Sequence, residues 1–250
     1  MENERNVPDV IMSFITAQGE STSRFCFLTI EEGGGQYQEQ NLKSEQDFLK
    51  AFSKNSIESR ERGWLPKNYK NRFTALGRPG IGICKVMAAL HGVDDWRKYA
   101  EEQLYGRNEQ NVRFFPISRR SIRDRNSETM QRIQSLLEMD IADYEKVCHE
   151  KRPAIFLKHP EIFNSNRFYI ITAKCAEPQW RSVLENIFPQ VVYRKEYLPI
   201  DKKKKFGFDV AWQGNRPVYL TFSLFKRGIT DKLLKDFANL LKNVNEIYYS

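Results

Sequence analysis

Residues 24–30, RFCFLTI, run directly into Glu31-Glu32-Gly33-Gly34-Gly35, and this junction is the most informative part of the chain. Aromatic and β-branched residues stand on both alternating faces of the apolar stretch, as is typical of a central strand buried on both sides. Three consecutive glycines after two acidic residues end such a strand. They also allow the backbone to approach a ligand closely. The junction therefore predicts a buried strand that ends in a ligand-binding loop.

The rest of the chain alternates between strand-like and helix-like patterns. Further strands are expected at residues 112–117, 154–157, 168–173, 191–197, 206–212 and 217–225. Helices are expected at residues 44–59, 82–90, 94–104, 127–149, 178–187 and 230–243. Alternation of this kind predicts an α/β fold with a central, mainly parallel sheet flanked by helices. Residues 1–23 are expected to form an N-terminal extension, and residues 24–250 a single α/β domain.

Composition excludes several classes of protein. The chain has 250 residues, 40% of them hydrophobic, so it can bury a substantial core. Mean hydropathy is −0.62, and no run of residues is long and apolar enough to span a membrane. The four cysteines lie far apart, which indicates free thiols in a reducing compartment. We therefore expect a cytoplasmic protein, or a nuclear one in a eukaryote, without a membrane partner.

The charge of the chain favours a polyanionic partner. Forty Lys and Arg residues exceed 32 Asp and Glu residues, for a net charge of +8. Residues 113–125, RFFPISRRSIRDR, contain five arginines and one aspartate, and residues 202–205 are four successive lysines. Nucleic acid is the commonest polyanion that such surfaces bind. We expect the partner to be nucleic acid, and DNA in particular.

Three polar segments follow predicted strands. A carboxylate of Glu31 or Glu32 could orient or deprotonate water. Hydroxyls and guanidinium groups suit phosphate oxygens, and they occur in two segments: Ser118, Arg119, Arg120, Ser121 and Arg123 in one, Thr221, Ser223, Lys226 and Arg227 in the other. Each segment also has a structural alternative. The acidic segment could be a solvated turn, and the segment from Ser118 to Arg123 a solvated basic loop. The segment from Thr221 to Arg227 could be a buried last strand followed by a basic turn.

Metal and nucleotide motifs are missing from the sequence. The three histidines and four cysteines show no zinc-ligand spacing, so no metal site is expected. The stretch GRPGIG at residues 77–82 superficially resembles a phosphate-binding loop, but it contains a proline and lacks the GK[ST] ending. No cofactor is therefore expected.

In this order, the three segments resemble the uracil-DNA glycosylase superfamily. Gly33 and Tyr37 stand where that family has a glycine and a tyrosine, whereas Gly35 takes the place of its water-activating acid. Phe114 and Phe115 lie where a base-reading asparagine belongs. Residues 221–223, Thr-Phe-Ser, replace a His-Pro-Ser element.

The resemblance implies a glycosylase-like fold in which one nucleotide is flipped out of the duplex into a cleft. Glu31 or Glu32 would then position water near the sugar carbon, and Tyr37, Phe73 or Phe115 would contact the base. The basic segments would clamp phosphates, with Arg119, Arg120, Lys226 and Arg227 as the cations. On this basis the chain is expected to excise or recognise a deaminated or modified base.

Two other functions remain open. A metal-dependent nuclease needs an acid followed by an acid-x-lysine element, and Glu161 with Thr172-Ala173-Lys174 has the spacing but a threonine in place of the second acid. A non-catalytic module that binds nucleic acid or protein, in defence or regulation, would account for the incomplete catalytic set.

Overall fold

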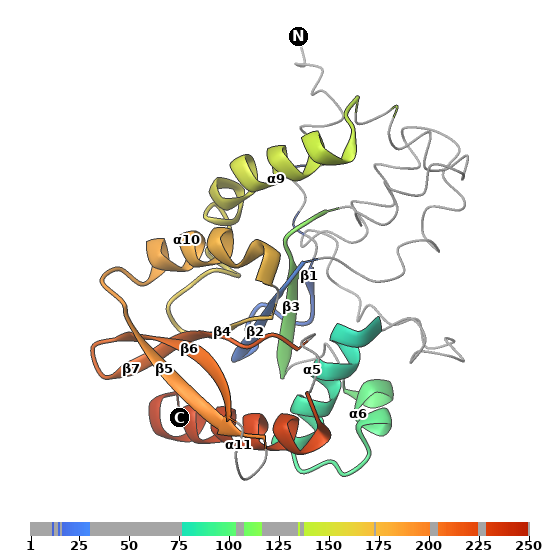
Figure 1. Ribbon diagram of the computed structural model, residues 1–250, viewed down its shortest axis with the longest axis vertical. Coiled ribbons are helices and arrows are strands. Elements are labelled where there is room, and N and C mark those ends of the chain that lie inside the picture. Colours follow the sequence, from blue (N-terminus) through green and yellow to red (C-terminus); the bar gives the residue numbers. More distant parts are fainter. Residues whose placement is uncertain are drawn as a thin grey trace.

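The computed structural model shows a mixed β-sheet between two layers of helices (Figure 1). It describes residues 12, 15, 17–30, 77–103, 108–116, 135, 138–172, 174–200, 205–224 and 229–249. The strands are β1 (Ala17–Gln18), β2 (Phe25–Thr29), β3 (Glu109–Arg113), β4 (Phe168–Ile171), β5 (Val192–Pro199), β6 (Lys205–Gln213) and β7 (Arg216–Thr221). Their order across the sheet is β1-β3-β2-β4-β7-β6-β5.

The sheet is mixed, which corrects the prediction of a mainly parallel one. Among the described strands, the neighbours β3-β2, β2-β4 and β4-β7 are parallel. The pairs β1-β3, β5-β6 and β6-β7 are antiparallel. The turn between β6 and β7 consists of Gly214 and Asn215, and Gly214 has a φ of 60°. A connection this short can join only antiparallel strands, because a parallel pair needs a long crossover.

Helices cover both faces of the sheet. One face packs against α5 (Gly77–Leu90), α6 (Trp96–Glu102) and α11 (Asp231–Tyr248), with Phe27 and Ile170 among the strand residues in that core. The other face packs against α9 (Ile141–Phe156) and α10 (Glu177–Ile187), with Leu28 and Ile171 in the second core. The adjacent residues Phe27 and Leu28 point to opposite faces, as alternation along a strand requires. Strand β2 is therefore buried on both sides, as its sequence predicts.

The predicted strand at residues 154–157 is wrong, because residues 154–156 form the last turn of α9. Asp140 begins this helix by accepting hydrogen bonds from the backbone N–H groups of Ala142 and Asp143. The helix then continues through Pro153. Tyr144, Cys148, Arg152 and Phe156 recur every four residues and are all buried, so the apolar residues belong to a helical stripe.

Strand β3 begins three residues earlier than predicted, at Glu109 rather than at residue 112. Its first three residues are polar but buried, a pattern that hydropathy does not indicate. Tyr99 on α6 donates a hydrogen bond of 2.6 Å to the Glu109 carboxylate. Because this hydrogen bond from α6 offsets the cost of burying the carboxylate, Glu109 can lie in the core.

Part of the predicted N-terminal extension lies within the fold. Met12 and Ile15 are buried in the core beneath α9, and Ala17 and Gln18 form β1 beside β3. The Nη1 atom of Arg152 donates a hydrogen bond of 2.7 Å to the carbonyl of Met12. Burial lowers the pKa of this guanidinium to about 10. The contact ties the N-terminal segment to α9.

Candidate functional site

The four parallel strands β3, β2, β4 and β7 end at one edge of the sheet, called here the carboxyl edge. The helices after β2 and those after β4 cover opposite faces, so the chain changes direction between these two strands. In open α/β sheets, ligands bind outside the carboxyl ends of strands at such a switch point. The end of β2 is therefore the place where the fold favours a ligand site.

The acidic segment begins at this switch point. Glu31 and Glu32, together with Tyr37 and Phe73, lie outside the described residues, but Ile30 immediately before them is described. The Oγ1 atom of Thr29 donates to Asn111 Oδ1 at 2.8 Å, and the Thr29 carbonyl accepts from Trp180 Nε1 at 3.3 Å. These contacts fix the end of β2 to β3 and to α10.

The described residues before the arginine segment are paired with those before the acidic segment. The backbone N–H of Phe115 donates to the carbonyl of Ile30 at 2.9 Å. The two segments of the chain are therefore still paired at Ile30, one residue before Glu31. Strands paired in this way lie about 4.8 Å apart. Residues 117–120 follow almost directly, but Ser118, Arg119, Arg120, Ser121 and Arg123 lie outside the described residues. The structure thus pairs the described residues that precede the two segments.

Phe115 itself is a core residue. Its side chain is 1% exposed, and its ring packs edge-on against Phe114 at 5.1 Å and tilted against Tyr144 at 5.9 Å. A ring enclosed in this way has no free face for a base. Phe115 therefore packs in the core, which opposes the base-binding role predicted for it.

The third segment begins at the end of β7, two strands from β2. Thr221 is half-buried and ends the strand, Ser223 is half-buried just beyond it, and Lys226 and Arg227 lie outside the described residues. The backbone N–H of Phe222 donates to the carbonyl of Ile171 at 2.9 Å, so this segment leaves the sheet beside β4.

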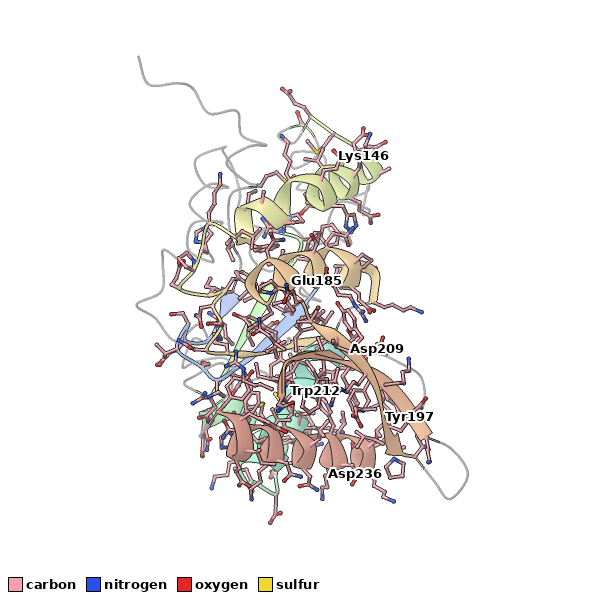
Figure 2. All side chains as sticks on the ribbon, turned by 90° about the vertical axis from the view of Figure 1, so that its left-hand side faces the viewer. Lys146, Glu185, Tyr197, Asp209, Trp212 and Asp236 are labelled. Atoms are coloured by element: carbon pink, nitrogen blue, oxygen red, sulfur yellow. The ribbon has the colours of Figure 1, made fainter. Side chains whose placement is uncertain are left out.

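The Thr221 hydroxyl belongs to a polar cluster of side chains from α10, β5, β6 and β7, formed by Glu177, Arg181, Lys195, Asp209 and Thr221. Arg181 Nη2 lies 2.6 Å from Glu177 Oε1 and 3.0 Å from Asp209 Oδ2. Arg181 Nη2 also donates to the hydroxyl of Thr221 at 3.4 Å, and Lys195 Nζ lies 3.1 Å from Asp209 Oδ1. Asp209 faces α10 in Figure 2.

The charges within this cluster balance, which limits what it can bind. Burial alone would raise the pKa of Asp209, but hydrogen bonds from Lys195 and Arg181 outweigh burial and hold that pKa below its usual value. Two cations then face two carboxylates. The cluster therefore fixes α10 against β6 and β7, and the phosphate-binding role predicted for Thr221 competes with this internal contact.

His149 is a polar group at this edge that the sequence did not single out. Its ring stacks on Phe114 at 5.2 Å and meets Phe115 edge-on at 5.6 Å, directly beyond β3. The Nδ1 atom is buried without a hydrogen-bond partner among the described residues. Only the approach of α9 to the end of β3 brings these residues together, so no spacing in the sequence could have indicated the contact.

The nuclease arrangement is not assembled in the described part of the chain. Glu161 lies in the connection between α9 and β4, whereas Lys174 follows β4. Glu161 instead pairs with His159 Nδ1 at 2.9 Å. No group of three or more potential metal ligands occurs among the described residues.

Comparison of the chain with models of known protein families, with curated proteins and with solved structures finds no match. Within the described residues, no helix has the length and apolar character needed to cross a membrane.

Proposed function

We propose that this chain binds nucleic acid, DNA in particular, at the carboxyl edge of its sheet and accommodates an extruded base at the switch point. The hydrogen bond between Phe115 and Ile30 supports the proposal, because it pairs the residues that precede the acidic and arginine segments. Carboxylates for chemistry and guanidinium groups for phosphates would then serve one substrate.

The proposed reaction is hydrolysis of an N-glycosidic bond, as the resemblance to uracil-DNA glycosylases implies. Water oriented by Glu32 would attack the sugar carbon, and its proton would pass to the carboxylate. The bond to the base would break, and the base would leave with the electron pair. Cations of the arginine segment would offset the negative charge of the leaving base.

Removal of two arginines tests the binding part of the proposal. The double variant R119A/R120A is expected to weaken DNA binding for all sequences and to reduce the slope of log K against log salt by about two, because each lost phosphate contact removes about one counterion. Fluorescence anisotropy between about 50 and 200 mM salt measures this slope. The matched control K98A/K242A removes the same charge from exposed positions on α6 and α11 and should leave the slope nearly unchanged. A wild-type protein that binds no nucleic acid at low salt contradicts the proposal.

Substitution of the acid tests the catalytic part. E32Q keeps the shape of the side chain and is expected to slow base excision by about 10² or more while changing DNA affinity by less than about threefold. The assay is release of free base from oligonucleotides containing uracil or other modified bases, followed by alkaline strand scission, with E31Q as the matched control. Excision that survives both substitutions places the acid elsewhere.

The same assay separates the alternatives. DNA binding without release of any base from a broad panel would favour a non-catalytic recognition module. Strand cleavage that EDTA abolishes would indicate the metal-dependent nuclease, since a glycosylase needs no metal.

A further inference from the structure

Strand β5 is an exposed edge of the sheet. It pairs with β6 on one side, and the sheet ends there in the described part of the chain. Three large hydrophobic side chains on this strand are exposed: Val192 is 60% exposed, Tyr193 39% and Tyr197 57%. Figure 2 looks onto this side of the molecule. An eight-residue edge with exposed apolar side chains is a template for a further strand.

The two faces of β5 have different surroundings. On the α10 side, Lys195 is paired with Asp209, and the ring of Tyr197 lies over Gly207, where an added Cβ would stand 3.1 Å from the ring. On the α11 side, the Arg194 guanidinium stacks on Trp212 at 4.6 Å. These contacts hold the side chains in place without covering the outer edge.

The sequence of β5 is complementary to itself in one antiparallel register. The backbone N–H and C=O groups of every second residue in a strand point outward, and in an antiparallel pair such residues lie opposite one another. The two-fold axis that relates two copies of β5 must therefore pass a residue and not a peptide bond. With Lys195 on the axis, Arg194 faces Glu196 of the second copy, Tyr193 faces Tyr197, and Val192 faces Leu198. A shift of one residue in either direction would place Arg194 or Glu196 against itself.

We propose that β5 pairs with β5 of a second copy of this chain in this register, so that two sheets become one. Opposite charges and aromatic pairs on directly opposed strand positions stabilise such pairing, whereas like charges oppose it. Lys195 meets its own equivalent on the axis, but Asp209 on each copy lies 3.1 Å from it and offsets the charge.

This association is independent of the proposed function. A two-fold axis perpendicular to the sheet reverses the strands of the second copy, so the two carboxyl edges face in opposite directions and both stay open. Loss of dimer formation with intact DNA binding, or the converse, would therefore show which proposal fails.

Charge reversal across the axis provides the test. Each substitution acts twice in the dimer, so R194E or E196R alone is expected to weaken self-association at least about tenfold. An equimolar mixture of R194E and E196R restores opposite charges at both contacts and is expected to dimerise within about threefold of wild type. Sedimentation velocity from low micromolar to several hundred micromolar protein measures both effects.

Controls separate self-association from folding. R194E loses the stacking on Trp212, whereas E196R does not, and circular dichroism checks both variants. The doubly swapped chain R194E/E196R should dimerise again with itself. K98E, on exposed α6, should behave as wild type. A wild type that stays monomeric at several hundred micromolar, or a folded E196R variant that dimerises unchanged, overturns the proposal.

Discussion

Arg181 connects elements that are distant in the sequence. Its guanidinium contacts a carboxylate one helical turn away on α10, another on β6, and the hydroxyl of Thr221 at the end of β7, 40 residues along the chain. The ring of Tyr193 on β5 lies 4.5 Å from the same group. One side chain thus holds the position of the strand end from which the last polar segment departs.

The low pKa of Asp209 predicts a pH-dependent contribution to stability. Since the folded-state pKa lies below the ordinary value of 3.8, the contribution is complete above that value and is lost as pH falls through the folded-state pKa. D209N is therefore expected to lower the free energy of unfolding by about 1–2 kcal/mol at neutral pH, with a smaller loss near pH 3. Urea denaturation at both pH values measures the difference.

The control for this prediction is Asp231, which pairs with Lys85 at 2.7 Å but is 74% exposed in its side chain. Exposed pairs contribute little, so D231N should change the unfolding free energy by less than about 0.5 kcal/mol. Equal effects of D209N at neutral and acid pH would show that the Asp209 charge does not stabilise the fold.

The hairpin of β5 and β6 is the element that carries the four lysines. Lys205 begins β6, and Lys202, Lys203 and Lys204 precede it outside the described residues. Strand β6, which Lys205 begins, is the third strand from β2 across the sheet, with β4 and β7 between them. We therefore predict that the four lysines attract a polyanion over a distance and do not read a base.

Replacement of all four lysines by glutamine is therefore expected to slow DNA association several-fold at low salt, because long-range attraction is reduced. Any preference among bases should stay the same. Stopped-flow association with matched oligonucleotides measures both quantities. A changed base preference would mean that the lysines contact the base directly.

At the scale of the whole molecule, the sheet offers two different edges. The carboxyl edge of the four parallel strands is where the polar segments begin, and the β5 edge at the far end is proposed to take a second copy. Strand β6 lies between the four parallel strands and β5. A nucleic-acid ligand and a second copy would thus occupy different surfaces of one sheet.

Local patterns were sufficient to predict several elements. Strands β2 and β4, helices α10 and α11, and the strands flanking Gly214 occur close to the expected positions, because side-chain alternation and helical periodicity are properties of short segments. The strand that precedes the acidic segment is buried on both faces, as expected. The positions of Glu31, Glu32 and the arginines themselves lie outside the described residues and stay predictions.

Contacts between distant segments could not be predicted in this way. The buried polar start of β3 depends on Tyr99, and the helical form of residues 154–156 depends on burial of Phe156 against the sheet. Strand order likewise arises from crossovers and hairpins that propensity does not specify. The sequence alone therefore predicted those elements whose local pattern was clear, and the polar residues available to them. Three-dimensional packing determined which strand ends became neighbours, because that outcome depends on which apolar faces are buried together.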